Sequence, residues 1–419
     1  MGMTVWLQFE GIRCFSTPQS ARIRPLTILV GENSSGKSTF LALCQIASAL
    51  AGGTKELPFN QAPFLLGAYD QIASWRGGRA GRAKSFSVGL SMTEDRRGGT
   101  FVAEFFPEAG QPSLCKWSLR KGNTHLNGTF NRPDTASFLE THRGTMILPD
   151  FAIFHPMFLG IPFKYWYPDG EASALERLLS GAEHKELEIA WELFRTSFGT
   201  GTYALAPIRS SPQRTYDPVS AIAKPEGSHV PMLLASMLDS ERAALWSAMR
   251  EFGFGSGLFD QIEVNRKGRK ESDPFQIGIR SGGPSVNLVD VGYGVSQVLP
   301  IIVDALQGAA SNQTLLLQQP EVHLHPRAQA ELGSFFVRLA NKKRRFIVET
   351  HSDYLVDRVR REVREGRLRP DDVSLLYFER GQHGSTVHNL DLDKGGSIEN
   401  PPESYRQFFL DEERQLLGV

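Results

Sequence analysis

Apolar positions predict an alternation of strands and helices at both ends of the chain. Near the N-terminus, the apolar run at residues 26–30 is followed by a helical pattern at residues 38–50. Near the C-terminus, short apolar strands at residues 314–317 and 345–348 flank a helical pattern at residues 327–341. Strands separated by helices are typical of parallel βαβ units, so the sequence predicts an α/β fold.

Alternating apolar and polar positions predict antiparallel strands elsewhere. Residues 4–16, 84–130 and 260–290 alternate in this way, with turn residues between the apolar runs. Residues 171–198 and 229–252 show helical spacing instead, without a sustained heptad repeat. These patterns predict three parts: an N-terminal lobe with an antiparallel β subdomain at 1–130, an inserted, mainly helical arm at 131–255, and a C-terminal lobe at 256–419.

Composition narrows the class of protein. The chain has 46 Lys and Arg residues and 46 Asp and Glu residues, whereas a protein that coats nucleic acid along its length is usually basic. Its three cysteines lie far apart and suggest neither a metal site nor a disulfide framework. There is no signal-peptide pattern at the N-terminus and no apolar stretch near the roughly 20 residues that span a bilayer. We therefore expect a cytoplasmic protein without a membrane partner.

The strongest chemical motif follows the apolar run at 26–30. Residues 31–38 fit the pattern G-x-x-x-x-G-K-[ST] without a gap, between a predicted strand and a predicted helix. Backbone N–H groups of such a loop point at phosphate oxygens, the lysine reaches the β- and γ-phosphates, and the hydroxyl holds Mg²⁺. The predicted contacts to ATP and Mg²⁺ come from Asn33, Ser34, Ser35, Gly36, Lys37, Ser38 and Thr39.

The apolar strand at 314–317 leads into Gln318, Gln319, Pro320 and Glu321. We call this segment the Walker B-like strand. Such a strand normally ends in a carboxylate that holds the Mg²⁺ shell, followed by a second one that polarises the attacking water. Here both positions are glutamine, and an amide can orient water but cannot take its proton. Glu321 is the nearest carboxylate, and it suits a part in catalysis and a helix N-terminal acid equally well.

Two further segments complete the candidate site. His351, in Glu-Thr-His-Ser directly after the apolar strand at 345–348, stands where a histidine can contact the γ-phosphate. The second segment, Gly-Tyr-Gly-Val-Ser-Gln at 292–297, precedes an apolar helical pattern and offers N–H groups and a hydroxyl to an anion. Its candidate nucleotide-binding residues are Gly294, Ser296 and Gln297.

The order of these segments resembles the RecF/SMC/OLD-like group of ABC-type AAA ATPases, and most of all the stand-alone members without a Toprim domain that occur in bacterial anti-phage defence operons. The resemblance covers residues 1–70 and 200–419 well and the middle poorly. It implies an ABC-type P-loop ATPase head that binds ATP and Mg²⁺. It also implies a homodimer or higher oligomer formed through these heads, and a separate effector protein, a nuclease.

The resemblance also implies residue roles. Ser296 and its neighbours match the signature segment that reaches the γ-phosphate across a head-to-head dimer, and His351 matches the switch histidine. Other matches are His323 and His325, expected near the dimer seam, Gln61 or Gln71 as the Mg²⁺-sensing glutamine, and Arg209 and Arg214, which receive no role.

Gln318 departs from the family pattern, because relatives carry Glu-Gln or Glu-Glu where this chain has Gln318 and Gln319. Gln318 thus replaces an acid expected among the metal ligands. Two explanations stay open: a Glu→Gln variant made to trap ATP, or a natural protein that binds ATP and hydrolyses it slowly.

Other segments suit either a structural or a binding role. Basic runs at 76–84 and 266–270 suit solvated loops or contact with nucleic acid, and aromatic runs at 151–158 and 163–167 suit a core or an interface. The sequence favours an ATPase that acts as sensor or scaffold in anti-phage defence. The alternative is a DNA-repair ATPase of the RecF or SMC kind. The neutral net charge and the lack of a coiled-coil pattern count against this alternative.

Overall fold

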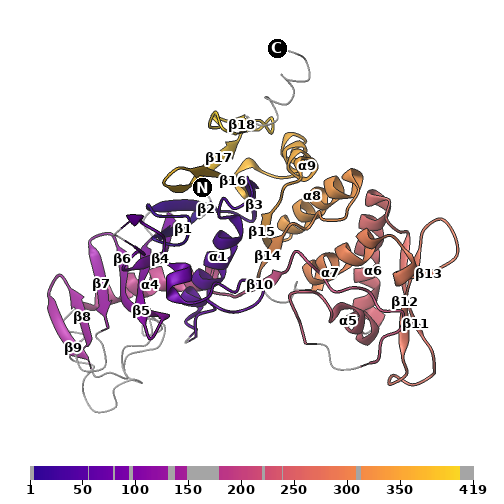
Figure 1. The fold of residues 1–419 in the computed structure, drawn as a ribbon, viewed down its shortest axis with the longest axis horizontal. Helices are drawn as coiled ribbons and strands as arrows, with labels where there is room; N and C mark the ends of the chain where they lie inside the picture. Colours follow the sequence, from indigo (N-terminus) through magenta and orange to yellow (C-terminus); the bar gives the residue numbers. More distant parts are fainter. Residues whose placement is uncertain are drawn as a thin grey trace.

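A computed structural model describes residues 4–54, 56–78, 81–93, 98–130, 137–148, 179–218, 222–237, 239–307 and 313–405. These residues form three β-sheets with helices packed on both faces of the central one (Figure 1). The α/β fold class predicted from the sequence is confirmed. The aromatic runs at 151–158 and 163–167 lie outside the described residues.

The central sheet carries the phosphate-binding motif. Its strand order is β10-β14-β15-β3-β16-β17-β18, with parallel pairing from β10 to β16 and antiparallel pairing beyond. This confirms the predicted parallel βαβ units. The strands are β10 (Thr202–Leu205), β14 (Thr314–Gln318), β15 (Arg345–Glu349), β3 (Leu26–Gly31), β16 (Val373–Gly381), β17 (Gly384–Leu392) and β18 (Ile398–Glu399).

The short apolar strands of this sheet are buried on both faces. Leu316 and Ile347 pack into one hydrophobic cluster, while their chain neighbours Leu315, Leu317 and Phe346 pack into another. Burial on both faces explains why these strands are continuously apolar rather than alternating. Helices α7 (Tyr293–Gln307), α8 (Pro326–Ala340) and α9 (Asp353–Arg364) belong to the second cluster, with α5 (Val230–Ser236) and α6 (Asp239–Ser256).

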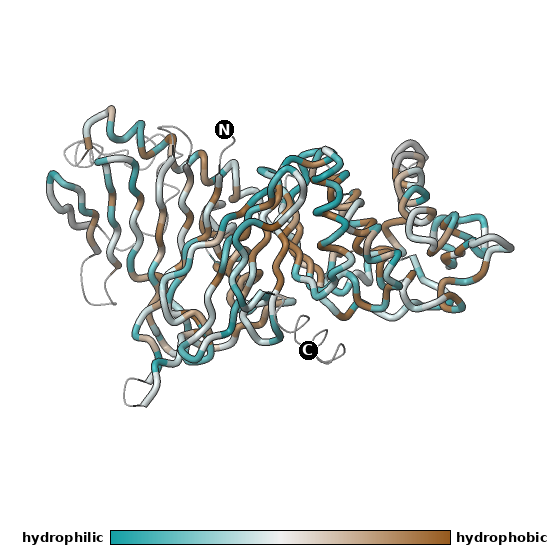
Figure 2. The backbone as a smooth tube through the Cα atoms, turned by 90° about the horizontal axis from the view of Figure 1, so that it is seen from above, coloured by the Kyte–Doolittle hydropathy of each residue, from teal (hydrophilic) through white to brown (hydrophobic). Residues whose placement is uncertain are grey.

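The first cluster joins the central sheet to an eight-stranded antiparallel sheet. Helix α1 (Lys37–Gly52) lies between the two sheets, and 13 of its 16 residues are buried. Along the strands of the large sheet, hydrophobic and hydrophilic residues alternate, as Figure 2 shows. The strands, in sheet order, are β2 (Gln19–Ile23), β1 (Thr4–Glu10), β4 (Phe86–Thr93), β5 (Thr100–Glu108), β6 (Gln111–Lys121), β7 (Thr124–Thr129), β8 (Ser137–Thr141) and β9 (Gly144–Leu148).

A small third sheet follows α6. It consists of β11 (Gln261–Arg266), β12 (Phe275–Arg280) and β13 (Val286–Asn287), all antiparallel, as the alternation at 260–290 predicts. Its Ile262, Phe275 and Ile277 join the cluster formed by α6, α7 and α8. The small sheet therefore supports the segment that leads into α7.

Residues 131–255, predicted as a mainly helical arm, contain strands as well as helices. This range contains α4 (Gly181–Ser197), α5 and α6, but β8 and β9 extend the eight-stranded sheet and β10 forms an edge of the central sheet. Strand pairing partners can lie far apart in sequence, so local patterns do not reveal which sheet a strand joins. Among the described helices, none is both long and apolar enough to cross a bilayer.

Candidate nucleotide-binding site

The loop at residues 31–38 turns sharply between β3 and α1. Gly31 and Gly36 have φ of 138° and 105°, and Ser34 has φ of 61°. A Cβ at Gly36 would lie 2.4 Å from the Phe15 ring, and one at Gly31 would lie 2.3 Å from the Phe378 carbonyl oxygen. Both positions thus require glycine for space as well as for backbone conformation.

Lys37 folds back over this loop. Its Nζ donates hydrogen bonds to the carbonyl oxygens of Gly31, at 2.8 Å, and Glu32, at 2.6 Å. The side chain is 3% exposed, and burial lowers the pKa of its amine. The ammonium group is therefore held at the mouth of the loop, beside the amides at the start of α1 that favour an anion.

Ser38 faces the end of the neighbouring strand β15. Its Oγ donates to the carboxylate of Glu349, with distances of 2.8 Å to Oε2 and 3.1 Å to Oε1. Glu349 is the register partner of Gln318 on β14 and is the first residue of the segment with His351. No role is predicted for Glu349 from the sequence, although an acid at the end of a short buried strand is a signal that could have identified it.

Arg209 contacts the backbone of the turn after β14. Gln319 has a φ of 42°, and its N–H donates to the Glu349 carbonyl oxygen at 2.8 Å. Arg209 Nη2 lies 3.3 Å from the carbonyl oxygen of Gln318 and 3.4 Å from that of Gln319. The side chain is 2% exposed, and burial lowers its pKa to about 10, so it remains charged at neutral pH. Arg209 therefore positions this turn.

Glu321 joins the same turn to the switch histidine. Its Oε1 accepts a hydrogen bond from the His351 N–H at 2.8 Å. Burial raises the pKa of Glu321, against the opposing effect of Arg209 nearby. Partial burial and the positive charge of Lys37 lower the pKa of His351, which keeps its ring neutral at pH 7. The P-loop lysine and His351 are thus close enough to interact.

The signature segment lies at the start of α7. Tyr293 is 46% exposed, whereas Ser296 and Gln297 are buried. The Ser296 hydroxyl donates to the Tyr293 carbonyl oxygen at 2.8 Å and so points inward. A Cβ at Gly294 would lie 2.7 Å from the His323 carbonyl oxygen. The exposed part of the segment is therefore its beginning, next to His323.

Two neighbouring contacts fix this segment. The Tyr293 ring meets the His323 ring edge-on, with centroids 5.0 Å apart. Arg214 donates to both carboxylate oxygens of Asp290, at 2.6 Å and 2.9 Å, just ahead of α7. The ring contact joins the segment at 292–297 to His323 after β14, and the ion pair joins the residues just ahead of α7 to Arg214.

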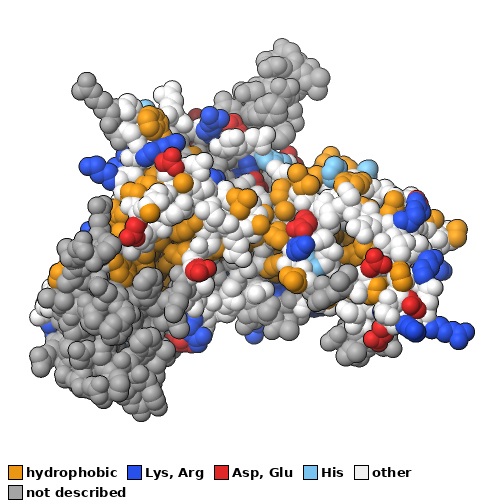
Figure 3. All heavy atoms as spheres, turned by 60° about the horizontal axis from the view of Figure 1, so that its bottom comes forward, with side chains coloured by type: hydrophobic (Ala, Val, Ile, Leu, Met, Phe, Trp, Pro, Cys, Tyr) orange, Lys and Arg blue, Asp and Glu red, His pale blue; other side chains and the backbone are white. Residues whose placement is uncertain are grey.

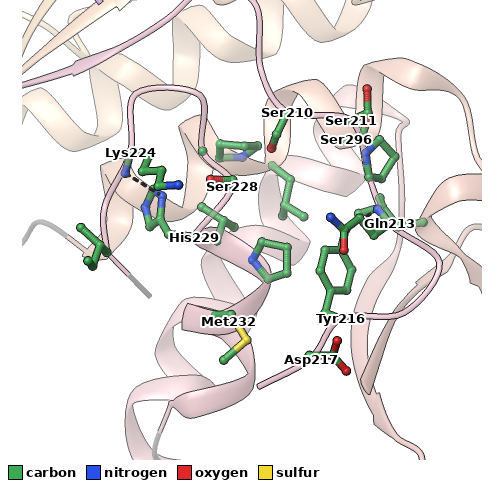
Figure 4. A pocket seen from close by; sticks show the side chains of 18 residues that line it. Ser210, Ser211, Gln213, Tyr216, Asp217, Lys224, Ser228, His229, Met232 and Ser296 are labelled. Atoms are coloured by element: carbon green, nitrogen blue, oxygen red, sulfur yellow. Dashed lines mark hydrogen bonds between the residues drawn. The ribbon is translucent and has the colours of Figure 1, made fainter. Parts of the chain in front are cut away.

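A cavity of about 430 Å³ lies beneath α7, beside α5 (Figure 4). Its lining includes Ser296, Tyr216 and His229, and no residue of the P-loop. His229 Nε2 lies 3.0 Å from Asp304 Oδ1, and both side chains are buried. This pocket is therefore separate from the phosphate-binding loop.

The two glutamines predicted as possible metal sensors contact residues outside the loop at 31–38. Gln71 Oε1 accepts from the Ala68 N–H at 2.9 Å, while Gln61 Oε1 lies 3.4 Å from Gln45 Nε2 on α1. These contacts do not choose between Gln61 and Gln71 as a metal sensor. Arg13, which the sequence analysis did not single out, reaches Thr39 Oγ1 at 3.5 Å and the Leu66 carbonyl oxygen at 3.0 Å.

Residues 233–357 match a family model described as "AAA domain, putative AbiEii toxin, Type IV TA system". The matched stretch includes the signature segment, the Walker B-like strand and His351. The P-loop at 31–38 lies outside it and is recognised by its own motif and geometry. No curated protein matches the chain.

Solved structures of SMC heads are similar to this chain at low identity. For the SMC head domain from Thermotoga maritima, identity is 12% and the TM-score 0.44, over 93% of this chain and 99% of that one. For an Smc head bound to the C-winged helix domain of ScpA, identity is 12% and the TM-score 0.47, over 93% of this chain and 98% of that one. For a Pyrococcus furiosus Smc head with an extended coiled coil, bound to the C-terminal domain of ScpA, identity is 12% and the TM-score 0.46, over 99% of this chain and 100% of that one.

Proposed function

We propose that this protein is an ATP-binding ABC-type ATPase. The observation that carries the proposal is the P-loop itself, with Lys37 at its mouth and Ser38 against the carboxyl end of the central sheet. Phosphates would take the positions offered by Lys37 and the first amides of α1. The Ser38 hydroxyl is an oxygen donor that suits Mg²⁺, which would neutralise charge on the phosphates when bound.

Hydrolysis by this site is expected to be slow. Gln318 and Gln319 cannot accept a proton from water, and Glu321 already accepts a hydrogen bond from the His351 backbone. The neutral His351 ring would donate a hydrogen bond to a phosphate oxygen. Nucleotide binding rather than rapid turnover would then be the main signal.

ATP would act by joining two heads. The exposed start of α7, with Gly292, Tyr293 and Gly294, offers backbone groups to a phosphate on another subunit, while Ser296 supports it from inside. The dimer would control a separate effector, a nuclease, in anti-phage defence. The toxin and toxin–antitoxin system named in the matched family description support a role of this kind. On the face in Figure 3, charges of both signs are interspersed, which favours a protein partner over a nucleic-acid track.

Sedimentation with and without ATP and Mg²⁺ tests the proposal. The wild-type protein should shift to a dimer or higher oligomer with nucleotide, and Lys37→Ala should neither shift nor bind it. Lys342→Ala, which changes an exposed lysine at the end of α8, is the matched control and should behave as wild type. A wild-type protein that shows no nucleotide binding by calorimetry would refute the proposal.

A further inference from the structure

The Walker B-like strand β14 lacks the acid that such a strand normally supplies to the metal, but the adjacent strand β15 ends in an acid. Glu349 ends β15, which lies between the Walker B-like strand β14 and the P-loop strand β3. Its carboxylate is 5% exposed and touches the Ser38 hydroxyl at 2.8 Å. It is therefore one strand closer to the P-loop than Gln318 is.

The separation of these two oxygens suits a shared metal. Mg²⁺ binds oxygens in a near-ideal octahedron at about 2.0–2.1 Å, so neighbouring ligands lie about 2.9 Å apart. The hydrogen bond of 2.8 Å between Ser38 Oγ and Glu349 Oε2 leaves the two oxygens at a separation that two ligands of one Mg²⁺ could also take. Because a P-loop hydroxyl is a Mg²⁺ ligand, the Glu349 carboxylate is the acid within reach of the same ion.

Gln318 is placed to support this carboxylate rather than replace it. The two residues are register partners on neighbouring parallel strands, so their side chains lie side by side on the same face of the sheet. A neutral amide can donate to a carboxylate, whereas a second carboxylate at position 318 would repel it. The glutamine that looks like a lost acid in the sequence thus accompanies an acid on the next strand.

We propose that Glu349 supplies the protein carboxylate to the Mg²⁺ that accompanies the nucleotide, in place of the acid that β14 lacks at Gln318. The remaining ligands would be Ser38, phosphate oxygens and water, a common set for Mg²⁺ in nucleotide sites. This proposal rests on the proposed function, since it concerns the metal of the same site.

A purely structural role for Glu349 predicts a different result when its charge is removed. If the carboxylate serves to hold Ser38 and the start of α1, then its oxygen matters and its charge does not. Glu349→Gln keeps an oxygen acceptor of similar shape and removes the charge. A metal-binding role requires the charge, so this variant separates the two roles.

The test uses Mn²⁺, which is visible by electron paramagnetic resonance, with a non-hydrolysable ATP analogue and the full chain. In Glu349→Gln, the Mn²⁺ affinity of the protein–analogue complex should fall at least about ten-fold. Analogue binding in excess EDTA should change less than about two-fold, because phosphate contacts to Lys37 and the loop amides remain. Glu188→Gln, an exposed acid on α4, is the control and should leave both affinities unchanged.

Unchanged Mn²⁺ affinity in a folded Glu349→Gln protein would overturn the assignment while leaving the proposed function in place. A wild-type protein that binds no analogue with or without Mn²⁺ would overturn both. If Glu349→Gln does not fold, Glu349→Asp is the second variant, since it keeps the charge on a shorter side chain. Weaker Mn²⁺ binding by that folded protein with unchanged analogue binding in EDTA supports the assignment, and unchanged Mn²⁺ binding or an equal loss of both overturns it.

Discussion

The carboxylate of Glu321 accepts a hydrogen bond from the backbone N–H of His351 at 2.8 Å. This contact joins the turn after β14 to the segment after β15. The sequence leaves open whether Glu321 takes part in catalysis or acts as a helix N-terminal acid, and the contact adds a third role. Glu321 positions His351.

Removing the Glu321 carboxylate should destabilise the fold. In Glu321→Ala, the His351 N–H loses its acceptor and Arg209 loses its nearby negative charge, so the free energy of unfolding should fall by about 1–3 kcal/mol. Urea unfolding measures this change. Glu188→Ala on the exposed face of α4 should change stability by less than about 0.5 kcal/mol, and an equal loss in both variants would contradict the role given to Glu321.

The stability of the protein should also depend on pH through Glu321. Burial raises the pKa of Glu321 above its ordinary value of 4.5, so the native state binds its proton more tightly than the unfolded state. Stability from this group is therefore complete below pH 4.5 and is lost as pH rises through the raised pKa. Between pH 4.5 and 8, unfolding experiments should show Glu321→Gln gaining stability relative to wild type. A difference that stays flat over this range would show that the pKa is not raised.

Arg209 should be required for a well-formed turn. Arg209→Ala removes the donor to the Gln318 and Gln319 carbonyl oxygens. We expect a loss of about 1–3 kcal/mol in the free energy of unfolding, measured by denaturant titration. Arg364→Ala, on the exposed side of α9, is the matched control and should be close to wild type.

The P-loop should not tolerate a methyl group at Gly36. Its φ of 105° strains any other residue, and the added Cβ would meet the Phe15 ring at 2.4 Å and Cys14 Sγ at 2.6 Å. Gly36→Ala should cost at least about 2 kcal/mol of stability and weaken nucleotide binding. Gly283→Ala, where a Cβ meets nothing within 4 Å, should leave thermal unfolding and nucleotide binding unchanged.

The two glutamines should respond differently to replacement by acid. Gln319 stands at the position that polarises water, so Gln319→Glu should raise ATP turnover at least about ten-fold in a phosphate-release assay. Gln318 stands beside Glu349, an acid that is already present on the next strand, so Gln318→Glu should change turnover less than about three-fold. A larger increase for Gln318→Glu than for Gln319→Glu would show that position 318 lacks the decisive acid.

The sequence by itself determined the parts that depend on local patterns. The glycine, lysine and serine spacing at 31–38 fixes a loop because the backbone there must take positive φ angles, and the apolar runs at 26–30, 314–317 and 345–348 fix buried strands. The helix expected at 38–50 is α1, and its apolar residues are buried.

The tertiary structure alone decided which strands lie side by side, because hydrogen bonding between strands is independent of their distance along the chain. It placed β15 between β14 and β3, so that Glu349 meets Ser38 from 311 residues away, and it placed β10 from the supposed helical arm beside β14. It also buried Arg209 under the turn of Gln318 and turned the Ser296 hydroxyl inward. The sequence therefore identified a phosphate-binding loop, and the packing of distant strands identified the acid beside it.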